Sequence, residues 1–221
     1  MTSASANSPP RRSARYKNVR APKRLLRPSV EASLTARQLE ILDTLDASVL
    51  RSDFADLTMA EIARRMSCSL RTLYDIAPSK DALVLAVADR QLRRVGREAM
   101  EALETDLPPL DRLRAYLRAT NRVLQPKTVL FSESFRKFEG ATELAEAHTR
   151  YIVEITRSLL DEAEQEGEIA AVDTSAIAFV LGRLGREFSR SETEGVGQKS
   201  PRESADLVAE IILSGLLATR T

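Results

Sequence analysis

Cysteine and histidine are almost missing from this 221-residue sequence, which contains one of each, Cys68 and His148. A single cysteine excludes an internal disulfide and is typical of a protein from a reducing compartment. No cluster of histidine, cysteine and carboxylate residues indicates a metal site, and no glycine-rich loop indicates phosphate binding. Since no nucleophile is paired with a base either, we expect neither enzymatic activity nor a cofactor or metal.

Long apolar runs are missing as well. No stretch approaches the ~18 residues that would indicate a membrane span. The opening MTSASANSPPRRSARYKN has no apolar core, so we do not expect a secretory signal. The 43% of hydrophobic residues is enough to build a core without disulfides or metals. We therefore expect a soluble cytoplasmic protein with no membrane partner.

Acidic residues are absent from residues 1–30, which hold eight of the 33 Lys and Arg residues. The remaining chain carries 25 bases against 32 acids, a net charge of −7, although the whole chain is at +1. A basic arm on an acidic body is the asymmetry expected of a nucleic-acid binder, but a solvated tail explains the composition equally well. Because Pro9, Pro10, Pro22 and Pro28 disfavour regular structure, we expect residues 1–30 to be a disordered arm, with DNA contact left open.

From Thr35 onward the apolar residues follow a helical period, with no strand pattern and no internal repeat. Capping boxes begin at Thr35 and Thr58, and Ser69 supplies a third helix cap. Three short helices with a tight connection between the last two form a helix-turn-helix arrangement. We assign it to residues 31–88.

Residues 89–221 continue the helical pattern and predict an all-α protein. A long helix capped by Ser79 and stopped at Pro108 connects the two parts. Further helices are expected at residues 110–124, around 131–138, and at 142–166, 173–190 and 201–217. The last two contain interior glycines, which each weaken a helix by ~1 kcal/mol and need a packing reason such as the close approach of another helix.

The second helix of a helix-turn-helix enters the major groove of DNA with its N-terminal residues against base edges. Arg71 is placed to bridge guanine O6 and N7, while Thr72 can contact a phosphate or a thymine methyl group. The Tyr74 hydroxyl can reach a phosphate, and the helix start at Thr58 can present backbone N–H groups to another. The candidate DNA-binding residues are Thr58, Ser69, Leu70, Arg71, Thr72, Tyr74 and Lys80.

Lys80 occupies the first position of the long helix if Ser79 is its cap. A cation there is unfavourable by ~0.3–1 kcal/mol because the helix dipole is positive at this end. A nearby phosphate would make the lysine favourable there, because the helix start and the ammonium group would both attract the phosphate. Compensation by Asp81 is the alternative explanation.

Residues 35–88 resemble the DNA-binding domain of TetR-family transcriptional regulators. The matching residues are Ile41-Leu42, Leu57-Thr58-Met59, Ile62-Ala63, Ser69-x-x-Thr72-Leu73-Tyr74 and Pro78-Ser79-Lys80-Asp81-Ala82-Leu83. The resemblance implies an all-helical dimer in which three helices bind DNA and a long fourth helix connects. The larger C-terminal part would bind an inducer and dimerise.

Two departures from the family pattern stand out. The family usually has Ala-Gly-Val where this chain has Met66-Ser67-Cys68. Since glycine there serves a turn with positive φ, we expect Ser67 to be strained or the turn to be altered. A second usual glycine is replaced by Arg71, which puts the operator sequence beyond inference.

Seven of the ten aromatic residues lie between residues 110 and 190, as expected for an apolar pocket between helices, although each also suits a plain core. His148 falls on an apolar helix face, where a hydrogen-bonded boundary histidine is the simpler interpretation. The candidate ligand-binding residues are Tyr116, Phe135, His148 and Tyr151.

Together these features predict a homodimeric, TetR-like repressor released from a palindromic double-stranded DNA operator by an unknown small-molecule effector. The last two helices would pair with their symmetry mates in a four-helix bundle. An effector-free architectural or activating DNA-binding protein is one alternative. A helical ligand-binding or enzymatic protein, in which the helix-turn-helix does not read DNA, is another. Neither the effector nor the regulated genes follow from the sequence.

Overall fold

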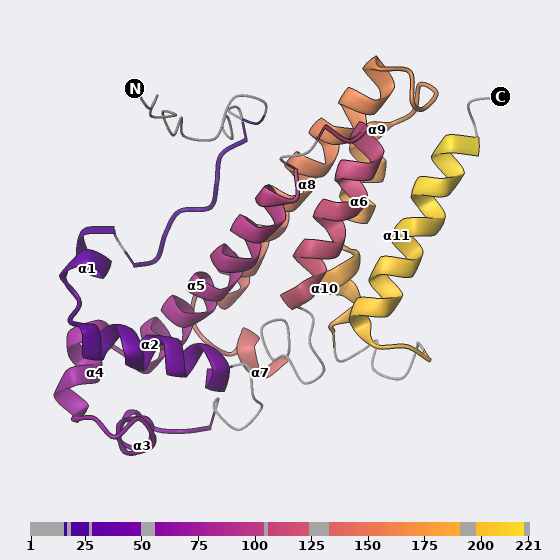
Figure 1. Cartoon of the computed structure of the whole chain (residues 1–221). Helices are drawn as coiled ribbons and strands as arrows, with labels where there is room; N and C mark the ends of the chain where they lie inside the picture. Colours follow the sequence, from indigo (N-terminus) through magenta and orange to yellow (C-terminus); the bar gives the residue numbers. More distant parts are fainter. Residues whose placement is uncertain are drawn as a thin grey trace, which may run out of the picture.

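The computed structural model describes residues 16, 19–26, 28–49, 56–103, 106–123, 133–190 and 198–218, and all regular structure in these ranges is helical (Figure 1). The predicted all-α fold class is confirmed. The helices are α1 (Pro28–Ser33), α2 (Ala36–Val49), α3 (Met59–Arg65), α4 (Leu70–Ile76), α5 (Lys80–Glu101), α6 (Pro109–Thr120), the 3₁₀ turn η1 (Asn121–Val123), α7 (Glu133–Arg136), α8 (Ala141–Gln165), α9 (Thr174–Leu181), α10 (Leu184–Phe188) and α11 (Pro201–Ala218).

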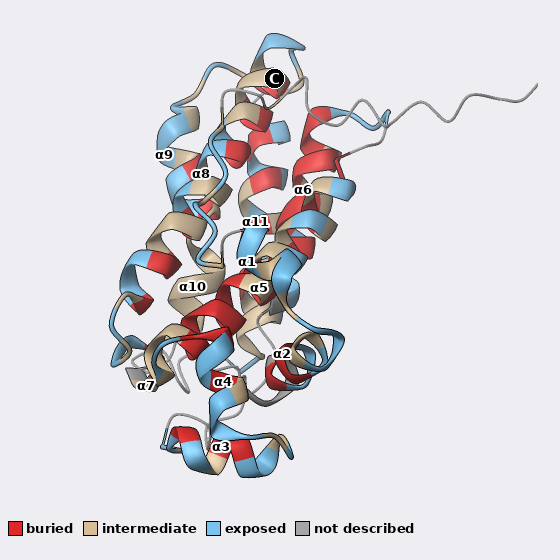
Figure 2. Ribbon diagram, turned by 90° about the vertical axis from the view of Figure 1, so that its left-hand side faces the viewer, coloured by how far each residue is buried: buried red, intermediate tan, exposed pale blue. Residues whose placement is uncertain are grey.

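The three helices α2, α3 and α4 share one apolar core. Leu42 of α2, Ile62 of α3 and Leu73 of α4 are fully buried in it. The outer sides of α3 and α4 are exposed (Figure 2). The short helices are therefore held by their buried faces, as expected of a helix-turn-helix.

Helix α5 belongs to two cores. Its first half, from Leu83 to Val95, packs in the same core as α2, α3 and α4, whereas Ala99 lies in a second core built by α6, α8, α9 and α11. Helices α5, α6 and α8 run side by side in this upper part (Figure 1). A displacement of α5 in the upper core therefore reaches the helix-turn-helix without passing through a loop.

The expected single helix at residues 173–190 is wrong, because the chain forms α9, a turn at Gly182 and the short helix α10. At the end of α9 the Arg183 N–H bonds the carbonyl of Val180 at 3.1 Å, three residues back, so the helix tightens and stops. The glycines at 182 and 185 lower helix propensity at this point. Helical periodicity continues through the break, which is why the sequence pattern concealed it.

Other boundaries differ less. Helix α8 ends before Gly167, which has φ +70°, as the sequence predicted. Helix α6 stops at Thr120 and continues as η1. Near 131–138 the described residues, which begin at 133, form the single turn of α7, and Phe131 lies outside them.

The prediction of a disordered arm is wrong for residues 19–26, called here the N-terminal segment. This segment runs along α5 (Figure 1), and the Leu25 N–H donates to Asp89 Oδ2 at 3.0 Å. Pro28 begins α1 rather than preventing a helix, because the first helical position needs no N–H donor. Residues 1–15, 17, 18 and 27 lie outside the described part of the chain. Among the described helices, none has the length and apolar character needed to cross a membrane.

Candidate nucleic-acid interface and ligand cavity

Thr58 caps α3 through a complete capping box. Its hydroxyl accepts from the Glu61 N–H at 3.3 Å, and its own N–H donates to Glu61 Oε2 at 2.7 Å. Bonds from Thr58, first from its backbone and then from its side chain, lower the pKa of Glu61. A phosphate approaching this helix start would meet that carboxylate, so Thr58 is the least favourably placed of the seven DNA-contact candidates.

Ser69 caps α4, the expected recognition helix. Its Oγ accepts from the Thr72 N–H at 3.0 Å and lies 2.8 Å from the Thr72 hydroxyl. The Thr72 hydroxyl is thus already engaged in the cap. Leu70, Arg71 and Tyr74 are exposed on the same helix, with Tyr74 at 50%. The surface that α4 offers to a partner is therefore cationic, aromatic and apolar.

The turn between α3 and α4 has the backbone that the sequence predicted. Ser67 has φ +48°, the one non-glycine residue with positive φ in the described part of the chain. The Cys68 N–H bonds the Ala63 carbonyl at 3.0 Å and the Ser67 N–H bonds the Arg64 carbonyl at 3.2 Å, the two bonds of a Schellman motif. Arg37 donates to the Met66 carbonyl at 3.0 Å and supports the turn from α2.

Lys80 is the first residue of α5, capped by Ser79, whose Oγ accepts from the Ala82 N–H at 3.1 Å. Its Nζ lies 5.6 Å from the centroid of the Phe138 ring. Asp81 accepts from the Glu139 N–H at 3.2 Å. The start of α5 thus contacts the turn that precedes α8, so this end of the interface is tied to the helical body.

The four predicted ligand residues are not brought together. Tyr116 is 1% exposed in the upper core, where burial raises its pKa well above the usual value. Phe135 is buried in the lower core. His148 and Tyr151 both line a cavity of about 320 Å³ between α5, α8 and the N-terminal segment. The structure therefore places two of the four residues at one candidate site.

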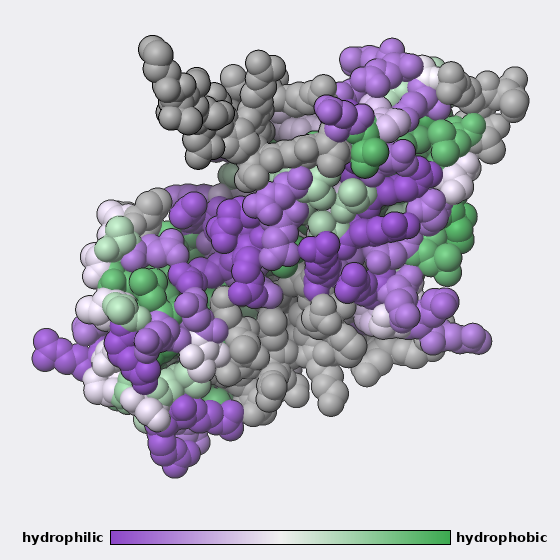
Figure 3. Space-filling model, in the orientation of Figure 1, coloured by the Kyte–Doolittle hydropathy of each residue, from purple (hydrophilic) through white to green (hydrophobic). Residues whose placement is uncertain are grey.

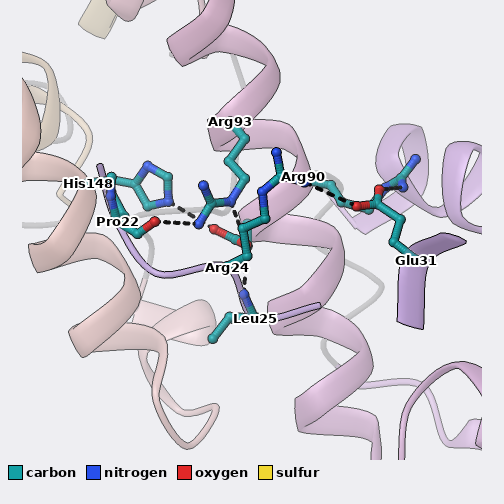
Figure 4. A network of polar contacts seen from close by, with 8 residues as sticks. Pro22, Arg24, Leu25, Glu31, Arg90, Arg93 and His148 are labelled. Carbon is teal, nitrogen blue, oxygen red and sulfur yellow. Dashed lines mark hydrogen bonds and ion pairs between the residues drawn. The ribbon is translucent and has the colours of Figure 1, made fainter. Parts of the chain in front are cut away.

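A buried polar network joins Pro22, Arg93 and His148, which line this cavity (Figure 4), and its centre is the carboxylate of Asp89. Its carboxylate lies 3.1 Å from His148 Nε2 and accepts from Arg93 Nε at 2.9 Å and from the Leu25 N–H at 3.0 Å. Arg93 also donates to the Pro22 carbonyl at 2.8 Å. Burial by itself would raise the pKa of Asp89, but these hydrogen bonds outweigh it and the pKa is lowered. The network fastens the N-terminal segment to α5 and α8.

The sequence offered one signal for this network, the Asp89–Arg93 pair at i,i+4 inside a long helix. His148 is a hydrogen-bonded boundary histidine, as its simpler interpretation expected, but the sequence pattern predicts neither its partner Asp89 nor the contacts of the N-terminal segment. A second, polar cavity of about 250 Å³ lies beside the network and shares Arg24, Arg93 and Arg97 with the first. Within the described ranges, no group of His, Cys, Asp and Glu side chains is placed to hold a metal ion.

These features define a class: a helix-turn-helix protein whose second capped helix is exposed and whose helical body is attached through α5. In sequence, the chain is 34% identical over 102 residues to Rv1255c of Mycobacterium tuberculosis, an uncharacterised HTH-type transcriptional regulator. That match covers 44% of this chain and 50% of the relative, so the chain spans about half of that relative's length. It is also 25% identical over 132 residues to the HTH-type transcriptional repressor KstR of Mycolicibacterium smegmatis, covering 60% of this chain and 65% of KstR. No family model matches the sequence.

Solved structures share the fold at low sequence identity. The TetR family transcriptional regulator PfmR from Thermus thermophilus superposes with a TM-score of 0.55 at 17% identity, over 80% of this chain and 98% of PfmR. AibR in complex with isovaleryl coenzyme A and operator DNA superposes with a TM-score of 0.57 at 18% identity, over 79% of this chain and 97% of AibR. The resemblance to TetR-family regulators is thereby confirmed: the relatives in sequence are HTH-type regulators, and the fold is that of the TetR family.

Proposed function

We propose that this protein is a sequence-specific DNA-binding transcriptional regulator, a homodimeric repressor whose affinity for a palindromic operator is lowered by a small-molecule effector. The observation that carries the proposal is the exposed side of α4, which presents Leu70, Arg71 and Tyr74 next to a capped helix start. The HTH-type regulators among its relatives support the same function. Residues 31–88 form the DNA-binding part in this proposal, and residues 89–221 form the regulatory part.

On DNA, α4 lies in the major groove with Arg71 against a guanine edge. Tyr74 and Lys80 contact phosphates and fix the position of the helix. Ser69 and Thr72 hold the helix start through their mutual hydrogen bond. Two such helices in a dimer would enter successive major grooves ~34–36 Å apart.

A ligand response is supported by the cavity against α5 and by AibR, which was solved with an acyl coenzyme A and operator DNA. Because α5 takes part in both cores, a ligand that favours one position of α5 also favours one position of α4. A ligand that binds the non-operator arrangement more tightly lowers DNA affinity by the ratio of its two affinities. An effector-free DNA-binding protein would be favoured by a fully packed body, and the cavity of about 320 Å³ argues against it.

The test begins with selection of bound sites from random DNA and continues with affinity measurements on the selected site at several salt concentrations. Arg71→Ala should lower the affinity by roughly tenfold to a hundredfold and relax selection at one base pair. Lys80→Ala should weaken binding to all sequences and reduce the salt slope by about one.

Arg157→Ala is the matched control, because Arg157 is an exposed arginine on α8, away from the proposed interface. If no site is selected, or if Arg71→Ala and Lys80→Ala bind like the control, the helix-turn-helix does not read DNA. The protein would then be a helical ligand-binding protein.

A further inference from the structure

The cavity between α5, α8 and the N-terminal segment has the composition of a site for an apolar group. Leu92, Gly96 and Met100 of α5 line it, facing Tyr151 of α8. A methyl group added at Gly96 would meet no other atom within 4 Å, so the helix surface is open at that position. The volume of about 320 Å³ is at the lower end of the range of small-molecule sites.

The adjoining polar cavity of about 250 Å³ has an excess of positive charge. Its lining includes five arginines and three carboxylates, namely Arg24, Arg90, Arg93, Arg94, Arg97, Glu31, Asp43 and Asp89. The carboxylates are already engaged: Asp89 binds Arg93, while Glu31 and Asp43 both bind Arg90, at 2.6 and 2.8 Å. Hydrophilic side chains form a band across this middle region of the molecule (Figure 3). A partly enclosed surplus of guanidinium groups attracts an anion.

The two cavities meet at three arginines, Arg24, Arg93 and Arg97. Arg93 is held by Asp89 and the Pro22 carbonyl, and Arg24 lies 3.5 Å from Glu31. Arg97 makes no hydrogen bond or ion pair within the described part of the chain. The arginine with the least competition therefore lies at the boundary between the apolar and the cationic cavity.

We propose that the joined cavities bind one amphipathic anion, with its apolar chain against Leu92, Gly96 and Met100 and its carboxylate or phosphate against Arg97 and Arg24. The N-terminal segment forms one wall of this site through Ala21 and Pro22. An amphipathic anion is thus the chemical class that we assign to the effector. Binding of the anion does not depend on the proposed function; only its effect on DNA affinity rests on that function. Because the segment leads directly into α1 and α2, a ligand here contacts both α5 and the chain that enters the helix-turn-helix.

Isothermal titration calorimetry of the full chain, without DNA, tests the binding. The probes are octanoate, octyl phosphate and octan-1-ol, which share an eight-carbon chain and differ in the head group. At least one of the two anions should bind once per chain, about tenfold or more tightly than the alcohol, because only the anions form charge-assisted hydrogen bonds. The anion that binds more tightly identifies the head group.

Two variants separate the halves of the site. Gly96→Leu should fill the apolar cavity and abolish binding of all three probes, while a retained melting temperature shows that the chain still folds. Arg97→Gln should reduce the preference for the anions to less than about threefold and leave octan-1-ol unchanged. Arg157→Gln removes the same charge from an exposed position outside both cavities and should bind all probes like the natural chain.

The proposal is overturned if no probe binds, if octan-1-ol binds as tightly as the anions, or if Gly96→Leu and Arg97→Gln bind like Arg157→Gln. Measuring affinity for the selected DNA site with and without each probe distinguishes the proposed ligand site from the proposed function. A probe that binds the cavity but leaves DNA affinity unchanged supports the site and contradicts effector release. A chain that binds no DNA, with or without a probe, contradicts the proposed function but not the proposed ligand site.

Discussion

Asp89 is the residue on which the position of the N-terminal segment depends. It is 3% exposed and receives hydrogen bonds from the segment and from its own helix, and its other oxygen lies 3.1 Å from His148 of α8. A carboxylate buried in this way needs its hydrogen-bond partners, because an unpaired buried charge destabilises the folded chain by several kcal/mol. The pKa of Asp89 is lowered although burial opposes this, because the hydrogen bonds favour the charged form.

We predict that Asp89→Asn lowers the free energy of unfolding by about 3 kcal/mol at pH 7, because Arg93 loses its buried counter-charge. The pKa of Asp89 in the folded chain lies below its ordinary value of 3.8. Its contribution is therefore complete above that pH and is lost as the pH falls through the lower, folded-state pKa. Urea denaturation at pH 7, 5 and 3 should show a difference between the natural chain and the variant that shrinks only at pH 3.

Asp106→Asn, at an exposed position, is the control and should change stability by less than about 0.5 kcal/mol. A difference between the natural chain and Asp89→Asn that stays constant from pH 7 to pH 3 would show that the charge of Asp89 is not what stabilises the segment.

Local features of single residues were predictable, whereas contacts between distant residues were not. The caps at Thr58, Ser69 and Ser79 and the positive φ of Ser67 depend on neighbours within a few positions, and each was found as expected. The contact of His148 with Asp89 joins residues 59 positions apart, and its partners follow no short-range pattern. The DNA contacts of the seven candidate residues remain predictions.

At the scale of the helix, the turn between α9 and α10 lies close against α8 at Gly182. A Cβ atom at Gly182 would lie 2.7 Å from Val153 Cγ2 and 3.0 Å from the Val153 Cα atom. Real Cβ atoms essentially never show a contact of 2.7 Å, and an approach of 3.0 Å is tighter than nine in ten of their contacts. The backbone of α8 cannot move away without disturbing the upper core. Glycine is therefore required here for packing, inside the chain rather than between chains.

We predict that Gly182→Ala lowers the free energy of unfolding by about 1–2 kcal/mol, because overpacking outweighs the gain of up to ~1 kcal/mol in helix propensity. Gly96→Ala is the matched control: it makes the same exchange within α5, where the added methyl meets open space. The control should raise the stability by up to ~1 kcal/mol. Thermal and urea unfolding of both variants measure the two effects, and a Gly182→Ala chain as stable as Gly96→Ala would contradict the packing explanation.

Helices with one apolar face are predicted best, as α8 shows: the expected range 142–166 compares with Ala141–Gln165. The Ser79 cap correctly predicts the start of α5 at Lys80, but the helix ends at Glu101, well before Pro108, where the sequence pattern predicts its stop. Two elements were missed for physical reasons. The helical periodicity of residues 173–190 continues across Gly182, so the pattern alone does not reveal the turn there. The N-terminal segment has no periodic pattern, because its backbone is held by single hydrogen bonds to Asp89 and Arg93 and not by a buried face.

At the scale of the whole molecule, α9 and α11 each leave large apolar side chains exposed. Helix α11 uses Ala205, Ala209 and Leu213 to pack inside the chain. Its opposite side carries Leu207 and Ile211, which are exposed at 48% and 62%. On α9, Phe179 and Val180 are exposed as well. A helix with apolar residues on two sides is expected to have a second partner, and a symmetric copy of the same face supplies one.

We predict that the natural chain, 24.5 kDa, is a dimer at micromolar concentration and that Ile211→Glu converts it to a monomer with unchanged helix content. A glutamate in an isologous interface would be buried next to its own symmetry mate, so one substitution places two like charges in the interface. Sedimentation velocity gives the mass, and circular dichroism gives the helix content. Leu70→Glu makes a similar exchange at an exposed residue of α4, outside this face, and should remain dimeric.

A natural chain that sediments as a monomer, or an Ile211→Glu chain that stays dimeric, would contradict the interface. A monomeric Ile211→Glu chain that keeps its α4 surface should still bind a half-site, but lose the affinity that comes from occupying two half-sites at once.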